Sequence, residues 1–315
     1  MSLRVLEPGM LSLLQDRGRF GQHGVGLTTG GPLDAEAFLL NQRLLGNPEN
    51  ATAIEISFGG LVLEAECDTS LCVTGASLPL DINGRELPPW EVHPVRAGDR
   101  IRLGYSERGC RSYLGVAGGF AIPPMFGSSA TVVREGIGGL RGEKLAAGDR
   151  LPCASRPAHP GRRLPRAWWP DYADEVTLRV IPGYQVADFP TLQQRRFFSL
   201  RWTVGQRSDR MGYRLEGPAI TCERQGILSE GICLGAIQVP ADGLPIVLLN
   251  DRQTIGGYPK IGAALSLDTA RLAQLRPGGG VRFRAISPEE AHNALHLARV
   301  RLHNAPLEAT ENRHG

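Results

Sequence analysis

The chain has 315 residues, of which 42% are apolar and 21% are charged, and this length is enough for two domains with cores of their own. Its net charge of +3 is small and dispersed, which excludes the concentrated basic surface of a nucleic-acid-binding protein. No apolar run reaches the length of a membrane span, and the first residues lack the apolar core of a signal peptide. The six cysteines form no CxxC pair, so we expect reduced thiols and a cytoplasmic protein.

Most of the chain is predicted to form strands. Runs rich in β-branched and other apolar residues are separated by glycine turns such as Asn83-Gly84 and Gly98-Asp99. The 40 glycines and 23 prolines suit many short strands joined by tight turns. In the first half the expected strands are residues 53–58, 61–65, 71–74, 100–103 and 113–117.

Two segments are predicted to be helices. Asp34 can cap the first one, whose apolar positions run from Ala37 to Leu45 before Gly46-Asn47-Pro48 ends it. The second begins with Ser287-Pro288-Glu289-Glu290, a capping box with proline at the first helical position, and is expected to continue to about Arg301.

Short echoes between the two halves predict two related β domains. Residues 3–9 are echoed by 178–183, residues 97–103 by 277–283, and Gln15-Asp16-Arg17-Gly18 by residues 208–212, in the same order. The alternative is that unrelated β segments use the same turn chemistry. We therefore expect a mainly β protein with an N-terminal β-barrel domain at 1–152, a proline- and arginine-rich linker at 153–174, a C-terminal barrel at 175–304 and a polar tail at 305–315. Within the linker, Trp168 and Trp169 are expected to pack on a barrel end.

Residues 208–260 are expected to line a binding site. Two Asp-Arg pairs lie beside glycines and flank apolar runs that predict strands. A guanidinium is a planar donor fork suited to carboxylates, amides and phosphates, and polar side chains at strand ends are typical of binding sites. The pairs are Asp209-Arg210 and Asp251-Arg252, and the polar residues that accompany them are Gln238, Gln253, Thr254, Tyr258 and Lys260.

Several common catalytic and cofactor signatures are absent from the sequence. The run at 138–144 has the wrong spacing for a phosphate loop, and no Met-Lys-Met offers a biotin attachment site. His292 and His296 are four residues apart, but Asn293 stands where a zinc protease has glutamate. No GxSxG elbow is present. The sequence therefore predicts no metal site and no covalently bound cofactor.

Motifs spread over nearly the whole chain carry a family resemblance. They are Gln15-Asp16-Arg17-Gly18 with 19–21, and residues 31–34, 41–47, 73–76, 116–119, 127–131, 208–212, 235–240 and 251–260. Together they resemble the allophanate-hydrolase-subunit-2 family, also called the biotin-dependent carboxyltransferase family.

The resemblance implies two cyclophilin-like β-barrels and a small-molecule amide substrate. It also implies a partner from the subunit-1 (KipI-like) family and, in an ATP-dependent 5-oxoprolinase, a third subunit of LamB/YcsF type. The implied reaction opens the lactam of 5-oxo-L-proline to L-glutamate, with ATP bound on this chain or on a partner, and with this chain inactive alone. Two alternatives are a carboxyltransferase that takes carboxyl groups from biotin to urea or a similar amide, and a KipA-type regulator that binds a KipI-type kinase inhibitor.

The implied reaction assigns possible roles to the candidate site residues. The site must hold a carboxylate and stabilise charge on an amide oxygen. Arg210 or Arg252 is expected to bind the carboxylate, and Asp209 or Asp251 to orient an arginine or accept a proton. Gln238, Gln253, Thr254 and Tyr258 would satisfy the amide, with Lys260 near the developing negative charge. Asp-Arg pairs at turns also brace loops, however, and we expect Asp16 and Arg17 to be structural or to contribute to an interface.

Overall fold

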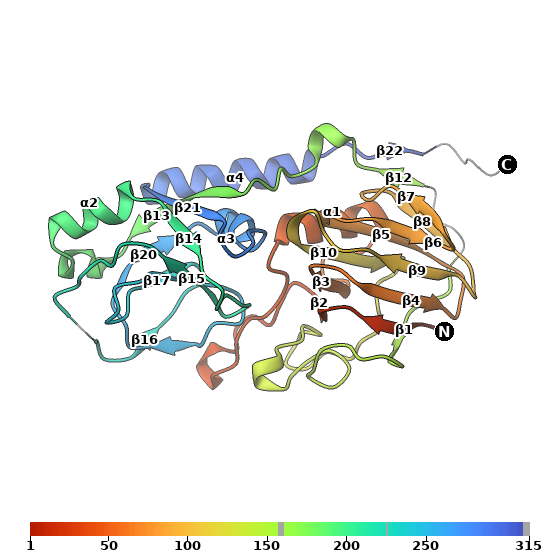
Figure 1. Ribbon diagram of the computed structural model, residues 1–315. Coiled ribbons are helices and arrows are strands. Elements are labelled where there is room, and N and C mark those ends of the chain that lie inside the picture. Colours follow the sequence, from red (N-terminus) through yellow and green to blue (C-terminus); the bar gives the residue numbers. More distant parts are fainter. Residues whose placement is uncertain (157–160, 225, 311–315) are drawn as a thin grey trace. The chain divides into compact units, whose positions relative to one another are not determined.

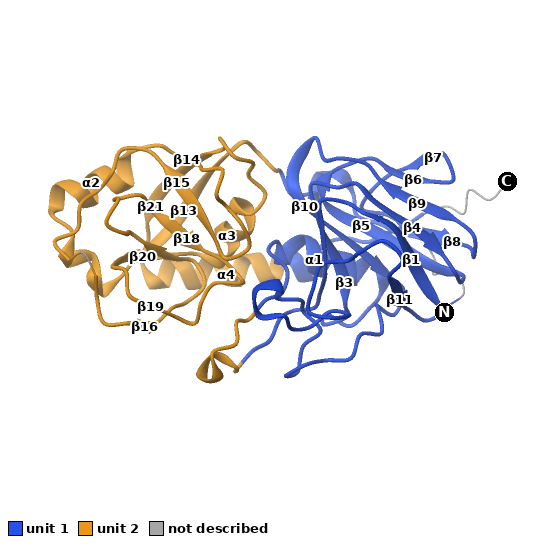
Figure 2. Cartoon of the chain, turned by 60° about the horizontal axis from the view of Figure 1, so that its bottom comes forward, with its two compact units in different colours: residues 1–20, 30–171, 302–315 blue, residues 21–29, 172–301 orange. Residues whose placement is uncertain are grey.

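The computed structural model describes residues 1–156, 161–224 and 226–310 (Figure 1). Strands predominate, and the described part of the chain contains four α-helices, so the expected mainly β fold is confirmed. The chain divides into two compact units, coloured in Figure 2: unit 1 is residues 1–20, 30–171 and 302–315, and unit 2 is residues 21–29 and 172–301. The domain limits drawn from the sequence stay predictions, and parts of the expected linker (157–160) and tail (311–315) lie outside the described residues.

The strands of unit 1 form two sheets that share one core. One has the order β11-β1-β4-β9-β6-β7 and the other β2-β3-β10-β5-β8, with antiparallel pairing throughout. Apolar residues of both sheets, such as Leu3, Ile54 and Leu63, pack into a single cluster. The strands are β1 (Ser2–Pro8), β2 (Leu11–Gln15), β3 (Ala53–Ser57), β4 (Leu61–Ala65), β5 (Thr69–Ser77), β6 (Leu80–Ile82), β7 (Arg85–Leu87), β8 (Val92–Val95), β9 (Arg100–Leu103), β10 (Arg108–Val116) and β11 (Arg150–Pro152).

Helix α1 (Ala35–Leu45) covers the second sheet of unit 1 and confirms the first helix prediction. Asp34 caps it by accepting a hydrogen bond from the Ala37 amide at 3.1 Å, and Gly46 ends it in the left-handed conformation at φ 65°. The helix packs on β5 and β10, where Phe38 meets Tyr113 edge to face with ring centroids 5.8 Å apart. This sheet is covered by α1 on one face and by the core shared with the first sheet on the other. All five residues of β3 are therefore buried, rather than alternate ones.

Residues 302–309 pack on the same core as α1. Ala305 is buried in the α1 cluster, and Leu302 and Leu307 pack against it. The α1 cluster is the group of buried side chains from α1, β3, β5, β8 and β10 together with Trp90, Leu164 and Ala305. Arg43 of α1 donates to the carbonyls of residues 302 and 305, and β22 (Glu308–Ala309) pairs with β12 (Arg162–Arg163). This packing was not expected from the polar composition of the last residues.

Trp168 and Trp169 do pack on a core, but on the α1 cluster of unit 1 rather than on the end of a barrel. Trp168 ends the short 3-10 helix η3 (Arg166–Trp168), and both tryptophans pack against the α1 cluster. Trp169 stacks on Trp90 with ring centroids 5.8 Å apart, and its indole nitrogen donates to the Leu164 carbonyl.

Unit 2 contains a closed barrel with the strand order β13-β20-β17-β18-β15-β14-β21. We expected a barrel in each half of the chain. Within the described residues, the strands of unit 2 form a closed barrel, whereas those of unit 1 form two sheets. Its first and last strands, β13 and β21, pair in parallel, whereas its other pairs are antiparallel. The strands are β13 (Glu175–Pro182), β14 (Trp202–Val204), β15 (Gly212–Glu216), β17 (Ala236–Gln238), β18 (Ile246–Leu248), β20 (Lys260–Ala264) and β21 (Gly280–Ala285).

A two-stranded ribbon in unit 2 stands outside the barrel order. It consists of β16 (Glu230–Gly231) and β19 (Ile255–Gly256), paired antiparallel, and we call it the β16–β19 ribbon. The 3-10 helix η4 (Tyr184–Asp188) follows β13 and packs against β20. These two elements frame the candidate site described below.

The helices of the C-terminal half were predicted only in part. The capping box of α4 (Pro288–Asn304) is confirmed, since the Ser287 amide donates to the Glu290 carboxylate at 2.8 Å and the Glu290 amide to the Ser287 hydroxyl at 3.2 Å. We did not predict α2 (Thr191–Ser199) or α3 (Ser266–Leu272), which are preceded by Pro190 and Leu265 and have no side-chain cap. Helix α2 packs on β21 and α3 packs on β13. These contacts stabilise the two helices, and a local sequence pattern does not reveal them.

None of the helices in the described ranges has both the length and the apolar character needed to cross a bilayer.

Candidate functional site

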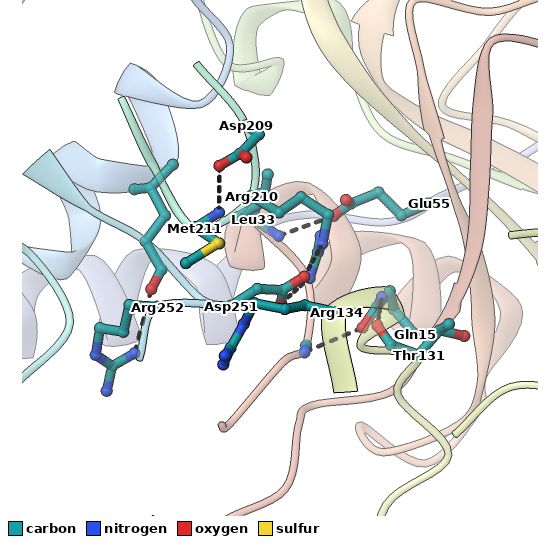
Figure 3. Close-up of polar contacts among 12 residues, drawn as sticks. Gln15, Leu33, Glu55, Thr131, Arg134, Asp209, Arg210, Met211, Asp251 and Arg252 are labelled. Atoms are coloured by element: carbon teal, nitrogen blue, oxygen red, sulfur yellow. Dashed lines mark hydrogen bonds and ion pairs between the residues drawn. The ribbon is translucent and has the colours of Figure 1, made fainter. Parts of the chain in front are cut away.

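The first predicted Asp-Arg pair is split between a turn and a buried ion pair. The Asp209 carboxylate accepts hydrogen bonds from the amides of Met211 at 2.8 Å and Gly212 at 3.3 Å, so it braces the turn that leads into β15. The Arg210 side chain is 6% exposed, and its Nε and Nη2 each donate to the Asp251 carboxylate at 2.9 Å (Figure 3). The arginine of one predicted pair therefore binds the aspartate of the other, in a bidentate geometry.

Arg252 differs from Arg210 in its partners. Its Nε donates to the Ile232 carbonyl at 3.2 Å and its Nη1 to the Leu249 carbonyl at 3.3 Å, and the residue is 6% exposed. Within the described ranges no carboxylate forms an ion pair with Arg252. Burial lowers the pKa of Arg252, because the charged form loses hydration. A buried cation without a counter-ion is costly, which makes Arg252 the better candidate to bind an anionic ligand.

Gln238 and Lys260 lie side by side on two neighbouring strands of the barrel, β17 and β20. They are direct partners in the antiparallel pairing of β17 with β20, so their side chains project from the same face. The register shifts between Ile237 and Gln238, an irregularity of the kind that redirects side chains near binding sites. Gln238 is 1% exposed, and its amide nitrogen Nε2 is buried with no hydrogen-bond partner in the described part of the chain. That unsatisfied donor calls for an acceptor from a ligand or from water.

Gly256 of the β16–β19 ribbon faces the Gln238 amide. A Cβ at position 256 would lie 2.7 Å from Gln238 Nε2 and 2.4 Å from Ile232 Cδ1, so any larger residue would displace one of them. Ile232 also links this glycine to Arg252, because its carbonyl accepts from the Arg252 guanidinium while its amide donates to the Thr254 carbonyl. The fold thus places Arg252, Gln238 and Gly256 around Ile232.

Three residues at this site were missed by sequence reasoning. The Glu230 carboxylate forms an ion pair with Lys260 and accepts hydrogen bonds from the Tyr184 hydroxyl and from Gln185 Nε2, the last at 3.0 Å. Gln185 Oε1 in turn accepts from the Lys260 amide at 2.7 Å. The hydrogen bonds from Lys260 and Tyr184 lower the pKa of Glu230, and the bond to Glu230 raises the pKa of Tyr184. These residues are distant from Lys260 in sequence, and no spacing rule connects them.

The remaining predicted site residues lie on or beside the ribbon. The amide nitrogen of Gln253 would be 3.5 Å from a Cβ at Gly256, Thr254 contributes its carbonyl to Ile232, and Tyr258 is 46% exposed. Their roles stay predictions. In unit 1, Asp16 accepts from the amides of Gly18 and Ser129 and from the Ser128 hydroxyl. That arrangement resembles the turn-bracing role of Asp209.

Arg252, Gln238 and Lys260 supply hydrogen-bond donors, two of them charged. Such a set is suited to a ligand that presents oxygen acceptors, above all a carboxylate together with a carbonyl. Among the described residues, no group of three or more His, Cys, Asp or Glu side chains is arranged to hold a metal ion.

The chain is similar to proteins of known family. A family model described as carboxyltransferase domain, subdomain A and B, matches residues 25–285. The C subunit of the 5-oxoprolinase of Escherichia coli (strain K12) is 38% identical over 93% of this chain and 94% of its own length, and that of Haemophilus influenzae is 35% identical over 94% and 97%.

A solved structure shares the fold as well. The urea carboxylase of Kluyveromyces lactis superimposes with a TM-score of 0.91 at 26% identity, over 97% of this chain. This chain spans only 29% of that protein, which therefore contains much that is not compared. The resemblance noted in the sequence motifs is confirmed, and the chain belongs to the carboxyltransferase domain family, subdomain A and B.

Proposed function

We propose that this chain is the C subunit of a 5-oxoprolinase, which hydrolyses 5-oxo-L-proline to L-glutamate together with partner subunits. The observation that carries this proposal is the similarity to two bacterial proteins of that name over almost the full length of each chain. The enzyme uses ATP, this subunit is inactive alone, and its partners are a subunit-1 (KipI-like) protein and a LamB/YcsF-type protein.

The donor set of unit 2 suits the chemistry of this substrate. 5-Oxoproline carries one carboxylate and one lactam carbonyl, and hydrolysis adds water to that carbonyl and breaks the ring C–N bond. Arg252 binds the substrate carboxylate, because the Arg210 fork is already bound to Asp251. Gln238 Nε2, which has no hydrogen-bond partner among the described residues, donates to the lactam oxygen, and Lys260 stabilises the negative charge that develops there.

The test is an ATP-dependent assay of glutamate release from 5-oxo-L-proline with both partners present, each omitted in turn. We expect activity only with all three chains. Arg252→Lys should raise KM for 5-oxo-L-proline by about tenfold or more, because the ammonium lacks the planar fork. Arg214→Ala, at an exposed position of β15, is the matched control and should leave KM within about twofold. A normal KM in a well-folded Arg252→Lys complex would contradict the assignment of Arg252, and inactivity of the complete complex would contradict the proposed function.

Carboxyl transfer is the second candidate, favoured by the family description and by the fold shared with urea carboxylase. In that case biotin would enter on a separate carrier protein. Urea-dependent ATP hydrolysis after addition of biotin-carrier and carboxylase chains would support it.

The KipA-type alternative makes a different prediction. A regulator that only binds a KipI-type inhibitor needs its binding surface but no substrate site. Its binding should therefore be unaffected by Arg252→Lys, and 5-oxo-L-proline should not bind to the chain in calorimetry.

A further inference from the structure

We propose that Glu230 is a positioning residue of this site: it holds the Lys260 ammonium beside the Gln238 amide, so that both donors face the same ligand oxygen. This inference rests on the proposed function for the identity of that oxygen, the lactam oxygen of the substrate. It adds to that function a residue that never touches the substrate.

Glu230 is linked to Lys260 in two ways, directly through an ion pair and indirectly through Gln185. Its carboxylate binds the Lys260 ammonium directly and also accepts from Tyr184 and Gln185 of η4. Gln185 is buried and uses both ends of its amide, since its oxygen accepts from the Lys260 backbone amide. The Lys260 side chain is 13% exposed, so it has little room to leave this arrangement. An ammonium has three donor hydrogens, so one bond to Glu230 leaves others for a ligand.

Glu230 also couples Lys260 to the β16–β19 ribbon. It is the first residue of β16, and its direct partner across the ribbon is Gly256, the residue that faces the Gln238 amide. Lys260 begins β20 opposite Gln238. One carboxylate therefore joins the ribbon, the barrel strand and η4 at the point where the unsatisfied Gln238 donor lies. Loss of this carboxylate should release Lys260 while leaving the barrel strands paired.

The use of lysine in this chain makes position 260 unusual. Of the 35 lysines and arginines, only Lys144 and Lys260 are lysines. Lys144 is exposed, whereas Lys260 is half-buried and ion-paired. Arginine carries a delocalised charge on a rigid fork, whereas lysine presents a compact charge whose three donors rotate. A compact charge suits a single oxygen atom better than a fork does.

The two lysines permit a direct test on the isolated chain, without substrate or partners. Brief acetylation with acetic anhydride at fixed pH, followed by mass spectrometry, gives the labelling rate of Lys260 relative to Lys144. We expect Glu230→Gln to raise this ratio about fivefold or more, because the amine is freed from its ion pair, and Glu230→Asp to raise it less. Glu175→Gln removes another ion-paired glutamate of unit 2, bound to Arg201 and Arg282, and should leave the ratio unchanged. An unchanged ratio in Glu230→Gln would overturn the proposal.

Kinetics of the complete complex provide the second measurement. Glu230→Gln should lower kcat about tenfold or more with KM within about threefold, because the positioned charge acts on the transition state. Glu230→Asp should recover part of the loss, and Glu175→Gln should behave as the unmodified complex. A change in KM alone would overturn the positioning role. If the labelling ratio changes as expected but the complex never releases glutamate, the proposed function fails while the link from Glu230 to Lys260 stands.

Discussion

Arg210 and Arg252 are equally buried, but their hydrogen-bond partners give them different roles. Arg210 is held by the Asp251 carboxylate through two hydrogen bonds, whereas Arg252 is held by two backbone carbonyls. Carbonyls fix the direction of a guanidinium without neutralising it. The charge of Arg210 is consequently used within the protein, and that of Arg252 remains available to an anion.

The Arg210–Asp251 pair should therefore matter mainly for stability. Arg210→Ala leaves the Asp251 carboxylate buried without this partner, and we expect it to cost about 3–5 kcal/mol of the free energy of unfolding. The measurement is urea unfolding of the single chain. Arg17→Ala removes an exposed ion pair with Glu49 and serves as the control, with an expected loss of at most about 1 kcal/mol. Equal effects of the two changes would show that the buried pair contributes no more than the surface one.

Sequence reasoning reached the candidate residues but not their pairing. Glycines and charged residues next to apolar runs identified residues 208–260, because turn chemistry is local. The bond from Arg210 to Asp251 joins residues 41 positions apart, and Glu230 lies 30 positions from Lys260. Contacts at such separations depend on how the strands close into a barrel, which no short motif specifies.

At the scale of elements, the β16–β19 ribbon is the part of unit 2 that most directly shapes the candidate site. It carries Glu230 and Gly256 on paired strands, and the next residues along the chain include Ile232. Its two strands have two residues each, too few to be stable without contacts to the barrel. The ion pair from Glu230 to Lys260 supplies one of those contacts.

The ribbon contains a matched pair of glycines for testing this. A Cβ at Gly256 would lie within 3 Å of both Ile232 and Gln238, whereas a Cβ at Gly231 would meet no atom within 4 Å. We expect Gly256→Ala to lower kcat/KM of the complete complex about tenfold or more, and Gly231→Ala to leave it within about threefold. Circular dichroism should show both variants folded. Full activity of Gly256→Ala would mean that the Gln238 amide is not part of the site.

The helices show what local sequence can and cannot predict. Asp34 before α1 and the capping box of α4 are side-chain signals that act within one turn, and both helices were predicted. Helices α2 and α3 have no such cap, and they were missed. The hairpin turn at Asn83-Gly84 was predicted from this dipeptide alone. In the structure the two residues have left-handed φ angles of 56° and 84°, a conformation that asparagine and glycine adopt most readily.

At the scale of the whole molecule, the two units are interleaved in sequence. Residues 21–29 belong to unit 2 although both neighbouring stretches belong to unit 1, and residues from 302 onward belong to unit 1. The echoes between the halves suggested two domains in succession. Composition and turn motifs detect strands, but they carry no information on which unit β22 joins.

Removal of the last residues should therefore affect unit 1. A chain that ends at Arg301 loses the packing of Leu302, Ala305 and Leu307 and both hydrogen bonds from Arg43, so we expect unit 1 to lose about 3 kcal/mol or more of stability. Tryptophan emission should shift to the red, because Trp90, Trp168 and Trp169 belong to or pack against this cluster. A chain that ends at Thr310 keeps every one of these contacts and is the control. Identical unfolding midpoints for the two truncated chains would contradict the expectation.

The parallel pairing of β13 with β21 and the return of residues 302–310 to unit 1 also constrain how the protein can be made. Domains generally fold from the N-terminus as the ribosome releases them. Here the barrel cannot close until β21 has been synthesised, and the α1 cluster is not covered until Leu302, Ala305 and Leu307 have emerged. Unit 1 therefore completes its core only after unit 2 has been synthesised, and a ribosome that stops before β21 releases a chain in which neither core is finished.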